Sequence, residues 1–233
     1  YYNAELFILK ASQMSHVQVE GIFSHLANAD ASDLSHAKLQ LKRFNAVLSL
    51  YDKHAIQKPK FQHIANAGGI LQLPESCLTM VRPGILLYGV YPSNQTRQTV
   101  KVRPSLSWET CVVYFKVIKA GHPVGYGSKW QSDHAVRAVT LPVGYGDGYM
   151  RAMSNNACVL IRGKRYPVAG TISMDQIVVN IEQDSAFNND IAVLIGEQGN
   201  QEITVEELAE WAGTIPYEIL TNINTRVPRI YIA

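Results

Sequence analysis

Residues 21–30 read GIFSHLANAD, residues 36–56 read HAKLQLKRFNAVLSLYDKHAI, and residues 63–69 read HIANAGG. The long middle stretch predicts an amphipathic helix that covers a sheet. Its apolar residues lie near helical spacing, with lysines and Asp52 between them: Leu39, Leu41, Phe44, Val47, Leu48 and Tyr51. The short apolar segments around it, VEGIFSHL, FQHIANAGG and VRPGILLYG, read as strands. Strands that alternate with helices predict parallel pairing in an α/β barrel, whose chemistry lies at the C-terminal strand ends.

From about Ser93 the pattern changes to one typical of a mostly antiparallel β-domain. Residues 94–103 are polar and read as a linker, so we expect one domain over residues 1–98 and another over 99–233. A capping box at Thr204 and Glu207 predicts a helix that continues through Trp211 and stops at Gly213, followed by a short helix over 216–223. Several β-rich runs precede these helices: TCVVYFKVI, AVRAVTLPV, ACVLIRG, YPVAGTI, QIVVNI and IAVLIG.

The composition indicates a compact protein and excludes several classes. Of 233 residues, 47% are hydrophobic and 17% are charged, and the net charge of +2 gives no reason to expect a nucleic acid as partner. No apolar run is long enough for a membrane span, and no signal peptide is recognisable, so neither a membrane partner nor export is expected. The chain does not begin with Met, which suggests a processed or truncated piece. Cys77, Cys111 and Cys158 form no metal motif and are expected to be buried, inert thiols in a cytoplasmic protein.

Several segments together resemble those of alanine racemases in order and approximate spacing: GIFSHLANAD, HIANAGG, VRPGILLYG, VGYGSKW (124–130), LPVGYGDGYMR (141–151), AGTISMDQIVVNI (169–181) and TRVPRIY (225–231). The resemblance implies a fold type III enzyme that uses pyridoxal 5'-phosphate (PLP), with the later part of a (β/α)8, or TIM, barrel followed by a C-terminal β-domain. It also implies interconversion of L- and D-alanine, which supplies D-alanine for the cell wall peptidoglycan. The family works in the cytoplasm as a homodimer whose active site is shared between subunits.

The family's reaction needs an acidified α-proton, which a PLP aldimine provides, and two groups on opposite faces of the substrate. In the family these groups are the PLP-bearing lysine and a tyrosine, and Tyr126 occupies the tyrosine's place in VGYGSKW. A free phenol with a pKa of about 10 is a poor base, so nearby cations are expected to assist it. Tyr145, in the second VGYG, matches a segment at the substrate entrance. The alternative for Tyr126 is simple packing in a glycine-rich turn.

Arg82, in VRPG, matches the arginine that hydrogen-bonds the pyridine nitrogen of PLP. Since an arginine is not deprotonated in proteins, it cannot pass that nitrogen a proton, and the weaker electron sink suits clean racemisation. His25 matches a histidine that the family links to this arginine and to the tyrosine. A lone histidine at a strand end is otherwise more often structural.

The remaining site residues also follow from the resemblance. The phosphate is expected to need backbone N–H donors and small residues. Two positions depart from the family pattern: Ala67 stands where a serine is common, and Thr225 where some members have a tyrosine. No metal site is expected. The expected cofactor contacts are Arg82, Asn66, Ala67, Gly84, Ile85 and Thr225, and the expected substrate contacts are Met174, Asp175 and Tyr145.

No lysine here has the sequence context of the family's PLP lysine, and a second substrate-binding arginine of the family is also missing. The chain is therefore expected to lack the N-terminal part of the barrel and to be inactive alone. A serine racemase of the same fold is one alternative, because its pocket differs little. A non-catalytic β-domain fragment is another. Arg82 disfavours the fold-related PLP decarboxylases, which typically pair the pyridine nitrogen with a carboxylate.

Overall fold

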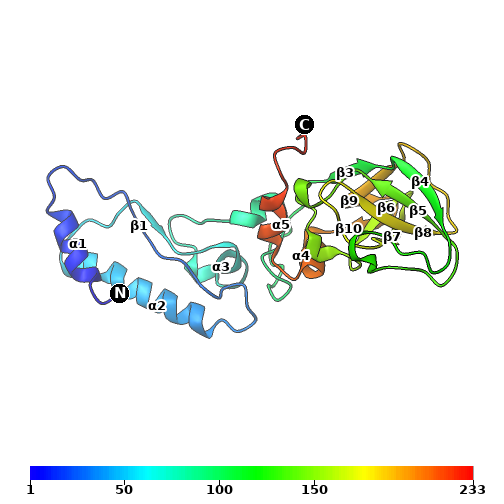
Figure 1. Cartoon of the computed structure of the whole chain (residues 1–233). Coiled ribbons are helices and arrows are strands. Elements are labelled where there is room, and N and C mark those ends of the chain that lie inside the picture. The colour runs from blue at the N-terminus through cyan, green and yellow to red at the C-terminus, as the bar shows by residue number, and fades with distance from the viewer. Residues whose placement is uncertain (233) are drawn as a thin grey trace. The chain divides into compact units, whose positions relative to one another are not determined.

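The computed structural model describes residues 1–232, which form two compact units (Figure 1). The first unit comprises Tyr1–Arg103 and the second begins at Pro104, so the division falls at the end of the polar stretch 94–103. The first unit combines helices with parallel strands, whereas the second is built mainly from antiparallel strands. An α/β part followed by a mostly antiparallel β part is the fold class that the sequence predicts.

A strand–helix–strand unit forms the centre of the first unit. After α1 (Ala4–Ser12), β1 (Gly21–Phe23) leads to α2 (Ser35–Lys53), which returns the chain to β2 (Phe61–His63). The two strands pair in parallel, with Gly21 opposite Phe61 and Phe23 opposite His63. The parallel pairing predicted from the alternating pattern is therefore confirmed.

One face of α2 supplies much of this unit's core. Ala37, Leu41, Phe44, Leu48 and Tyr51 are all buried, at spacings of four and three residues. The prediction that Leu39 lies on the same face is wrong, because Leu39 is 42% exposed. Two residues before Leu41, it lies about 200° away around the helix, on the solvent side.

The VRPGILLYG segment does not form the strand expected there. Pro83 has no N–H to donate, and Gly84 has a φ of +54°, so the chain turns into a 3₁₀ helix at Gly84–Tyr88. Only isolated bonds tie the preceding residues to the β2 segment, including Arg82 N–H to the Ala65 carbonyl at 3.0 Å. Arg82 is thereby fixed beside the end of β2. Between them lie α3 (Ala67–Gln72) and a 3₁₀ turn at Pro74–Ser76.

Two antiparallel sheets form the second unit. The larger sheet has the order β10-β9-β6-β7 with β3 also paired to β9, and the smaller has the order β4-β5-β8. The strands are β3 (Trp108–Cys111), β4 (Tyr114–Ile118), β5 (Val136–Leu141), β6 (Cys158–Ile161), β7 (Lys164–Pro167), β8 (Ile177–Glu182), β9 (Ile191–Gln198) and β10 (Gln201–Ile203).

The run TCVVYFKVI is divided between the two sheets. Val112 donates its N–H to the Asp190 carbonyl beside β9, whereas Val113 donates to the Thr140 carbonyl of β5. Adjacent residues thus bond to different sheets, and the strand must break between β3 and β4. The apolar alternation alone could not reveal this change of partner.

The two predicted C-terminal helices are confirmed. α4 (Val205–Ala212) begins after the Thr204 and Glu207 capping box, in which each side chain accepts from the other's backbone N–H. It ends at Gly213, whose φ is +70°. α5 (Pro216–Asn222) follows, with proline in its first turn.

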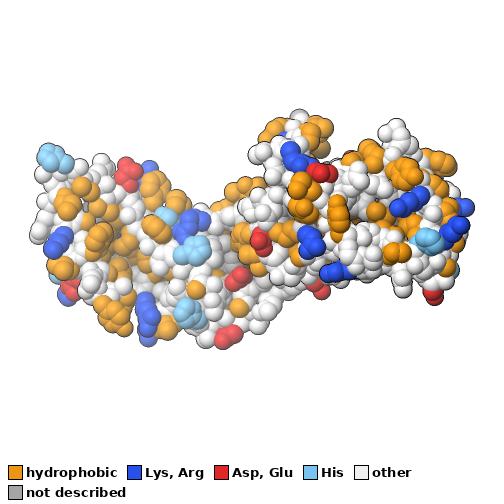
Figure 2. Space-filling view, viewed as in Figure 1, with side chains coloured by type: hydrophobic (Ala, Val, Ile, Leu, Met, Phe, Trp, Pro, Cys, Tyr) orange, Lys and Arg blue, Asp and Glu red, His pale blue; other side chains and the backbone are white. Residues whose placement is uncertain are grey.

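Some hydrophobic side chains and one cysteine are exposed at the surface of the first unit. Hydrophobic side chains gather on the face of the first unit around α1 and β1 in Figure 2. Phe7 on α1 and Phe23 on β1 are both largely exposed. Cys77 is exposed, and the expectation of a buried thiol is wrong for it, because it follows the short 3₁₀ turn Pro74–Ser76 at the unit's surface. Within residues 1–232, no helix is both long and apolar enough to cross a membrane.

Candidate active site

Arg82 lies at the centre of a polar cluster at the C-terminal ends of β1 and β2. Its Nη2 donates to the Ser24 carbonyl at 2.8 Å and contacts Nδ1 of His25 at 3.2 Å. Its Nη1 contacts Nδ1 of His63. The structure therefore brings together Arg82 and His25, as the resemblance implied, and adds His63 to them.

The guanidinium determines which ring nitrogen of His63 carries hydrogen. An arginine has only donors, so Nδ1 of His63 must accept, and in the neutral ring the hydrogen then lies on Nε2. His25 is an exposed residue with a donor group beside each ring nitrogen: Nη2 of Arg82 lies 3.2 Å from Nδ1, and Nδ2 of Asn66 lies 3.4 Å from Nε2. A neutral ring can accept at only one of the two.

His63 is the functional residue that the sequence reasoning missed. Its ring stacks on Phe23 with centroids 5.4 Å apart and an interplanar angle of 8°. Burial and the charge of Arg82 hold the pKa of His63 below its ordinary value. A neutral ring is the form that can accept from Arg82. The only sequence signal was the position of His63 at the end of a predicted strand, in HIANAGG.

Asn66 holds the start of α3 rather than leaving its side chain free. Oδ1 of Asn66 accepts from the Gly69 N–H at 3.1 Å, and Nδ2 donates to the Leu26 carbonyl at 3.1 Å. An added Cβ on Gly68 would lie 2.4 Å from the Ala29 carbonyl, so the helix start packs closely against the loop after β1. The backbone of Ala67 is thereby fixed.

Gly84 and Ile85 start the next helical turn, where backbone N–H groups lack helical partners. A Cβ added to Gly84 would meet nothing within 4 Å, so this turn has open space beside it. A pocket of about 400 Å³ lies elsewhere in the unit, between α1, β1 and α2. Its lining is mostly apolar and reaches the Arg82 cluster through Phe23 and Ser24.

In the second unit, Tyr126 projects from a tight loop between β4 and β5. The side chain is 74% exposed, and its backbone carbonyl accepts from Oγ1 of Thr171 at 2.8 Å. The flanking glycines Gly125 and Gly127 both have a φ of +76°. A Cβ on Gly125 would lie 2.9 Å from the Thr171 nitrogen. The glycines therefore allow the loop to pack closely on the 170–171 segment while the phenol stays in solvent.

Tyr145 and Met174 lie on two loops that bond directly to each other. The N–H of Tyr145 donates to the Ser173 carbonyl at 3.0 Å, and the N–H of Gly146 donates to the Met174 carbonyl at 2.9 Å. A Cβ on Gly144 would lie 2.2 Å from the Ser173 oxygen. The two side chains are 43% and 52% exposed respectively, so both are available at the surface of this unit.

Thr225 joins this group through its neighbours. The N–H of Asn224 donates to the Asp147 carbonyl at 2.9 Å, and Arg226 pairs with the carboxylates of Asp147 and Asp175. The predicted site residues thus fall into two sets, one in each unit: His25, Asn66, Ala67, Arg82, Gly84 and Ile85 in the first, and Tyr126, Tyr145, Met174, Asp175 and Thr225 in the second. Among residues 1–232, no cluster of His, Cys, Asp and Glu side chains could hold a metal ion.

Comparison with known proteins finds similarity along nearly the whole chain. Residues 2–92 match the family model described as alanine racemase, N-terminal domain, and residues 105–231 match alanine racemase, C-terminal domain. An alanine racemase of Carboxydothermus hydrogenoformans is 45% identical over 222 residues, which cover 94% of this chain and 60% of that protein. The chain therefore spans about three fifths of the length of this curated relative.

Solved structures give the same result. The alanine racemase of Streptomyces coelicolor A3(2) superposes with a TM-score of 0.92 at 36% identity, over 99% of this chain and 61% of that one. An alanine racemase of Bartonella henselae with covalently bound pyridoxal phosphate gives a TM-score of 0.86 at 31% identity, over 99% of this chain and 62% of that one.

Proposed function

The chain belongs to the alanine racemase family, and from this premise we propose that it supplies the pyridine-binding arginine and the second base of a PLP-dependent alanine racemase. The observation that carries the proposal is the cluster in which Arg82 is held by Ser24, His25 and His63. The PLP-bearing lysine is proposed to lie outside residues 1–233. The product D-alanine would serve peptidoglycan synthesis in the cytoplasm.

The residues of the first unit fit PLP. Arg82 would donate to the pyridine nitrogen, and its contacts leave further N–H groups of the guanidinium for this purpose. The backbone N–H groups of Ala67, Gly84 and Ile85, at the starts of two helical turns, are suited to the phosphate. Asn66 would act indirectly, because its side chain already caps α3. When bound, PLP withdraws electrons from the substrate Cα and so acidifies its proton.

Arg82 would set the electronic character of the site. Its guanidinium keeps its protons at any physiological pH, so the pyridine nitrogen would receive a hydrogen bond and not a proton. The three protein contacts fix the guanidinium before the cofactor arrives, which is the pre-organisation that electrostatic catalysis requires.

Tyr126 is proposed to remove or return the proton on the face of the substrate opposite the lysine. It would do so in the active site of a second copy of the chain, within a homodimer. The phenol needs help to act as a base, and the positive charge of Arg82 beside His25 on the other copy would favour the phenolate. Tyr145 would border the entrance, and the backbone of Met174 would bind the substrate carboxylate. Asp175 would orient the Met174 loop, and Thr225 would contact the phosphate.

The experiment measures conversion of L-alanine to D-alanine with added PLP. It compares the chain alone with a fusion that places, ahead of Tyr1, the N-terminal part of the Carboxydothermus hydrogenoformans racemase that has no counterpart here. We expect only the fusion to bind PLP, seen by visible absorbance, and to form D-alanine.

Two variants and a second substrate sharpen the result. Tyr126→Phe should abolish turnover, whereas Tyr114→Phe, which alters another phenol that is 60% exposed, should leave it unchanged. Turnover of serine in place of alanine would identify a serine racemase of this fold. A fusion that binds PLP but racemises neither amino acid would contradict the proposal and favour a non-catalytic role.

A further inference from the structure

Arg226 joins three separate segments of the second unit. Its Nε donates to Oδ1 of Asp147 at 2.7 Å, and its Nη2 donates to Oδ1 of Asp175 at 2.5 Å. We propose that Arg226 is a positioning residue that holds the Tyr145, Met174 and Thr225 segments in one arrangement. The "Arg226 clamp" denotes Arg226 with the carboxylates of Asp147 and Asp175.

Asp147 is the firm end of the clamp. Its side chain is only 12% exposed, and both of its carboxylate oxygens are occupied, Oδ1 by Arg226 and Oδ2 by the Gly144 N–H at 2.8 Å. The Asp147 carbonyl also accepts from the Asn224 N–H. A carboxylate with little solvent and two charge-assisted bonds is a strong anchor, so the turn at 144–147 and the chain at 224–226 are fixed together.

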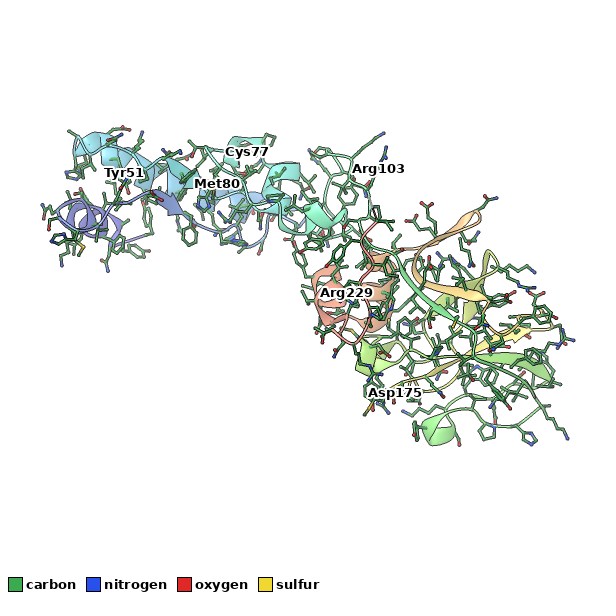
Figure 3. All side chains as sticks on the ribbon, turned by 90° about the horizontal axis from the view of Figure 1, so that it is seen from above. Tyr51, Cys77, Met80, Arg103, Asp175 and Arg229 are labelled. Carbon is green, nitrogen blue, oxygen red and sulfur yellow. The ribbon has the colours of Figure 1, made fainter. Side chains whose placement is uncertain are left out.

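Asp175 is the exposed end. Its side chain is 62% exposed, and it lies at the surface of the second unit in Figure 3. An exposed ion pair contributes little alone because solvent screens it. Here, however, the guanidinium is already held by Asp147, so little further side-chain entropy is lost when it also binds Asp175. The Met174 loop is therefore tied to the same anchor.

The absence of a side chain at Gly146 leaves room for the guanidinium of Arg226. A Cβ added to Gly146 would lie 2.9 Å from Nη1 of Arg226 and 3.0 Å from the Met174 carbonyl. Any larger residue would push the guanidinium away from its position over this turn. The glycine, the two carboxylates and the Gly146–Met174 hydrogen bond are independent features that agree on one geometry.

The ligands assigned to the three segments rest on the proposed function. The ion pairs of the Arg226 clamp are observed independently of it. Each segment carries a residue proposed to meet substrate or cofactor: Tyr145 at the entrance, Met174 at the carboxylate, Thr225 at the phosphate. Arg226 touches none of these ligands in the proposal. It acts by holding the segments that do, and so it is a positioning residue.

The first test needs no activity and uses the chain without PLP. Amide hydrogen exchange is measured by mass spectrometry for wild type, Arg226→Gln and Gly146→Ala. Both variants should speed exchange at least about fivefold in peptides covering 144–147 and 173–176, because the local opening cost falls. Peptides from β6 and β9 should be unchanged. Arg162→Gln, which removes a surface ion pair with Asp190, is the control and should alter neither clamp peptide.

Exchange that rises equally throughout the second unit would show a general stability role, and unchanged exchange at 144–147 and 173–176 would show no clamp; either result overturns the inference. Arg226→Lys distinguishes charge from geometry. A lysine cannot bridge both carboxylates with a planar fork, so it should resemble Arg226→Gln. Full protection in the lysine variant would contradict the bridging geometry.

The second test uses the active fusion. Arg226→Gln should raise the KM for alanine roughly tenfold with a smaller change in kcat, because ground-state binding is affected more than proton transfer. The pH dependence of kcat should keep its shape, since Tyr126 and His25 are intact. If the fusion proves inactive, the proposed function fails while the exchange result still stands. If it is active and Arg226→Gln leaves the KM unchanged, the positioning role fails alone.

Discussion

Nη1 of Arg82 donates to Nδ1 of His63, and this contact is possible only while the histidine is neutral. Burial first, and the charge of Arg82 second, lower the pKa of His63 below its ordinary value of 6.5. In the unfolded chain neither influence is present. The unfolded state therefore binds this proton at a higher pH than the folded state does, and the stability of the first unit must depend on pH.

His63 should make the chain less stable in mild acid. Because its folded pKa is depressed, its contribution is present above the ordinary value and is lost as the pH falls through the folded value. Between about pH 7 and pH 5, Tm should fall more steeply for wild type than for His63→Gln, which keeps an acceptor but does not titrate. Thermal unfolding followed by circular dichroism measures both. Parallel curves would mean that His63 has the same pKa in the folded and unfolded states.

Tyr126→Phe should abolish catalysis without affecting the fold. Its side chain is 74% exposed and the loop is held by backbone contacts, so removing the hydroxyl costs little stability. Loss of a general acid–base should lower kcat of the active fusion by roughly 100-fold to 10,000-fold. Steady-state racemisation and thermal unfolding together check this. A kcat within a factor of about three of wild type would exclude Tyr126 as the base.

Tyr149→Phe should preserve or increase stability. Tyr149 is fully buried against Trp108, and in residues 1–232 its hydroxyl is the buried side-chain polar atom that lacks a hydrogen-bond partner. Removing it should raise the free energy of unfolding by up to about 1 kcal/mol. Tyr166→Phe is the matched control, because the Tyr166 hydroxyl donates to Asp184 at 2.7 Å. That variant should lose about 1 kcal/mol in urea unfolding.

The reverse order of these two tyrosines would contradict the assignment. A loss for Tyr149→Phe as large as for Tyr166→Phe would mean that the Tyr149 hydroxyl does bond, for instance to an ordered water.

Gly144→Ala should cost more stability than Gly121→Ala. Gly144 has extended backbone with a φ of −158°, so its penalty is purely steric: the new Cβ would lie 2.2 Å from the Ser173 oxygen. Gly121 has a φ of +74° with nothing within 4 Å, so only backbone strain opposes alanine. We expect losses of about 2–3 kcal/mol and about 1 kcal/mol respectively. Equal losses would mean that the 144 and 173 loops are not in close contact.

The fold was predictable where local pattern and tertiary structure agree. The spacing of Leu41, Phe44 and Leu48 identifies α2, and the Thr204 capping box identifies α4, because both signals are local. The sequence pattern predicted the wrong secondary structure where contacts with distant parts of the chain determine it. The break between Val112 and Val113 depends on which sheet each N–H reaches, and the turn at Gly84 follows from a positive φ.

The site shows the same division. Motifs drew attention to Arg82 and Tyr126, because their sequence contexts are distinctive. They did not identify His63 or Arg226, whose roles depend on partners far along the chain: His63 contacts Arg82, and Arg226 contacts Asp147 and Asp175. No spacing rule links residues 147, 175 and 226, so only the folded unit reveals their cluster.

Complementation between two inactive variants tests the shared racemase site most directly. In the active fusion, Arg82→Gln and Tyr126→Phe should each be nearly inactive as homodimers. Mixed subunits would pair an intact Arg82 from one chain with an intact Tyr126 from the other. After unfolding and refolding the two variants together with PLP, the mixture should recover about a quarter of wild-type D-alanine formation, since half of the dimers would carry one intact site. If the mixture stays as inactive as its components while both bind PLP, Arg82 and Tyr126 do not serve one site across two subunits.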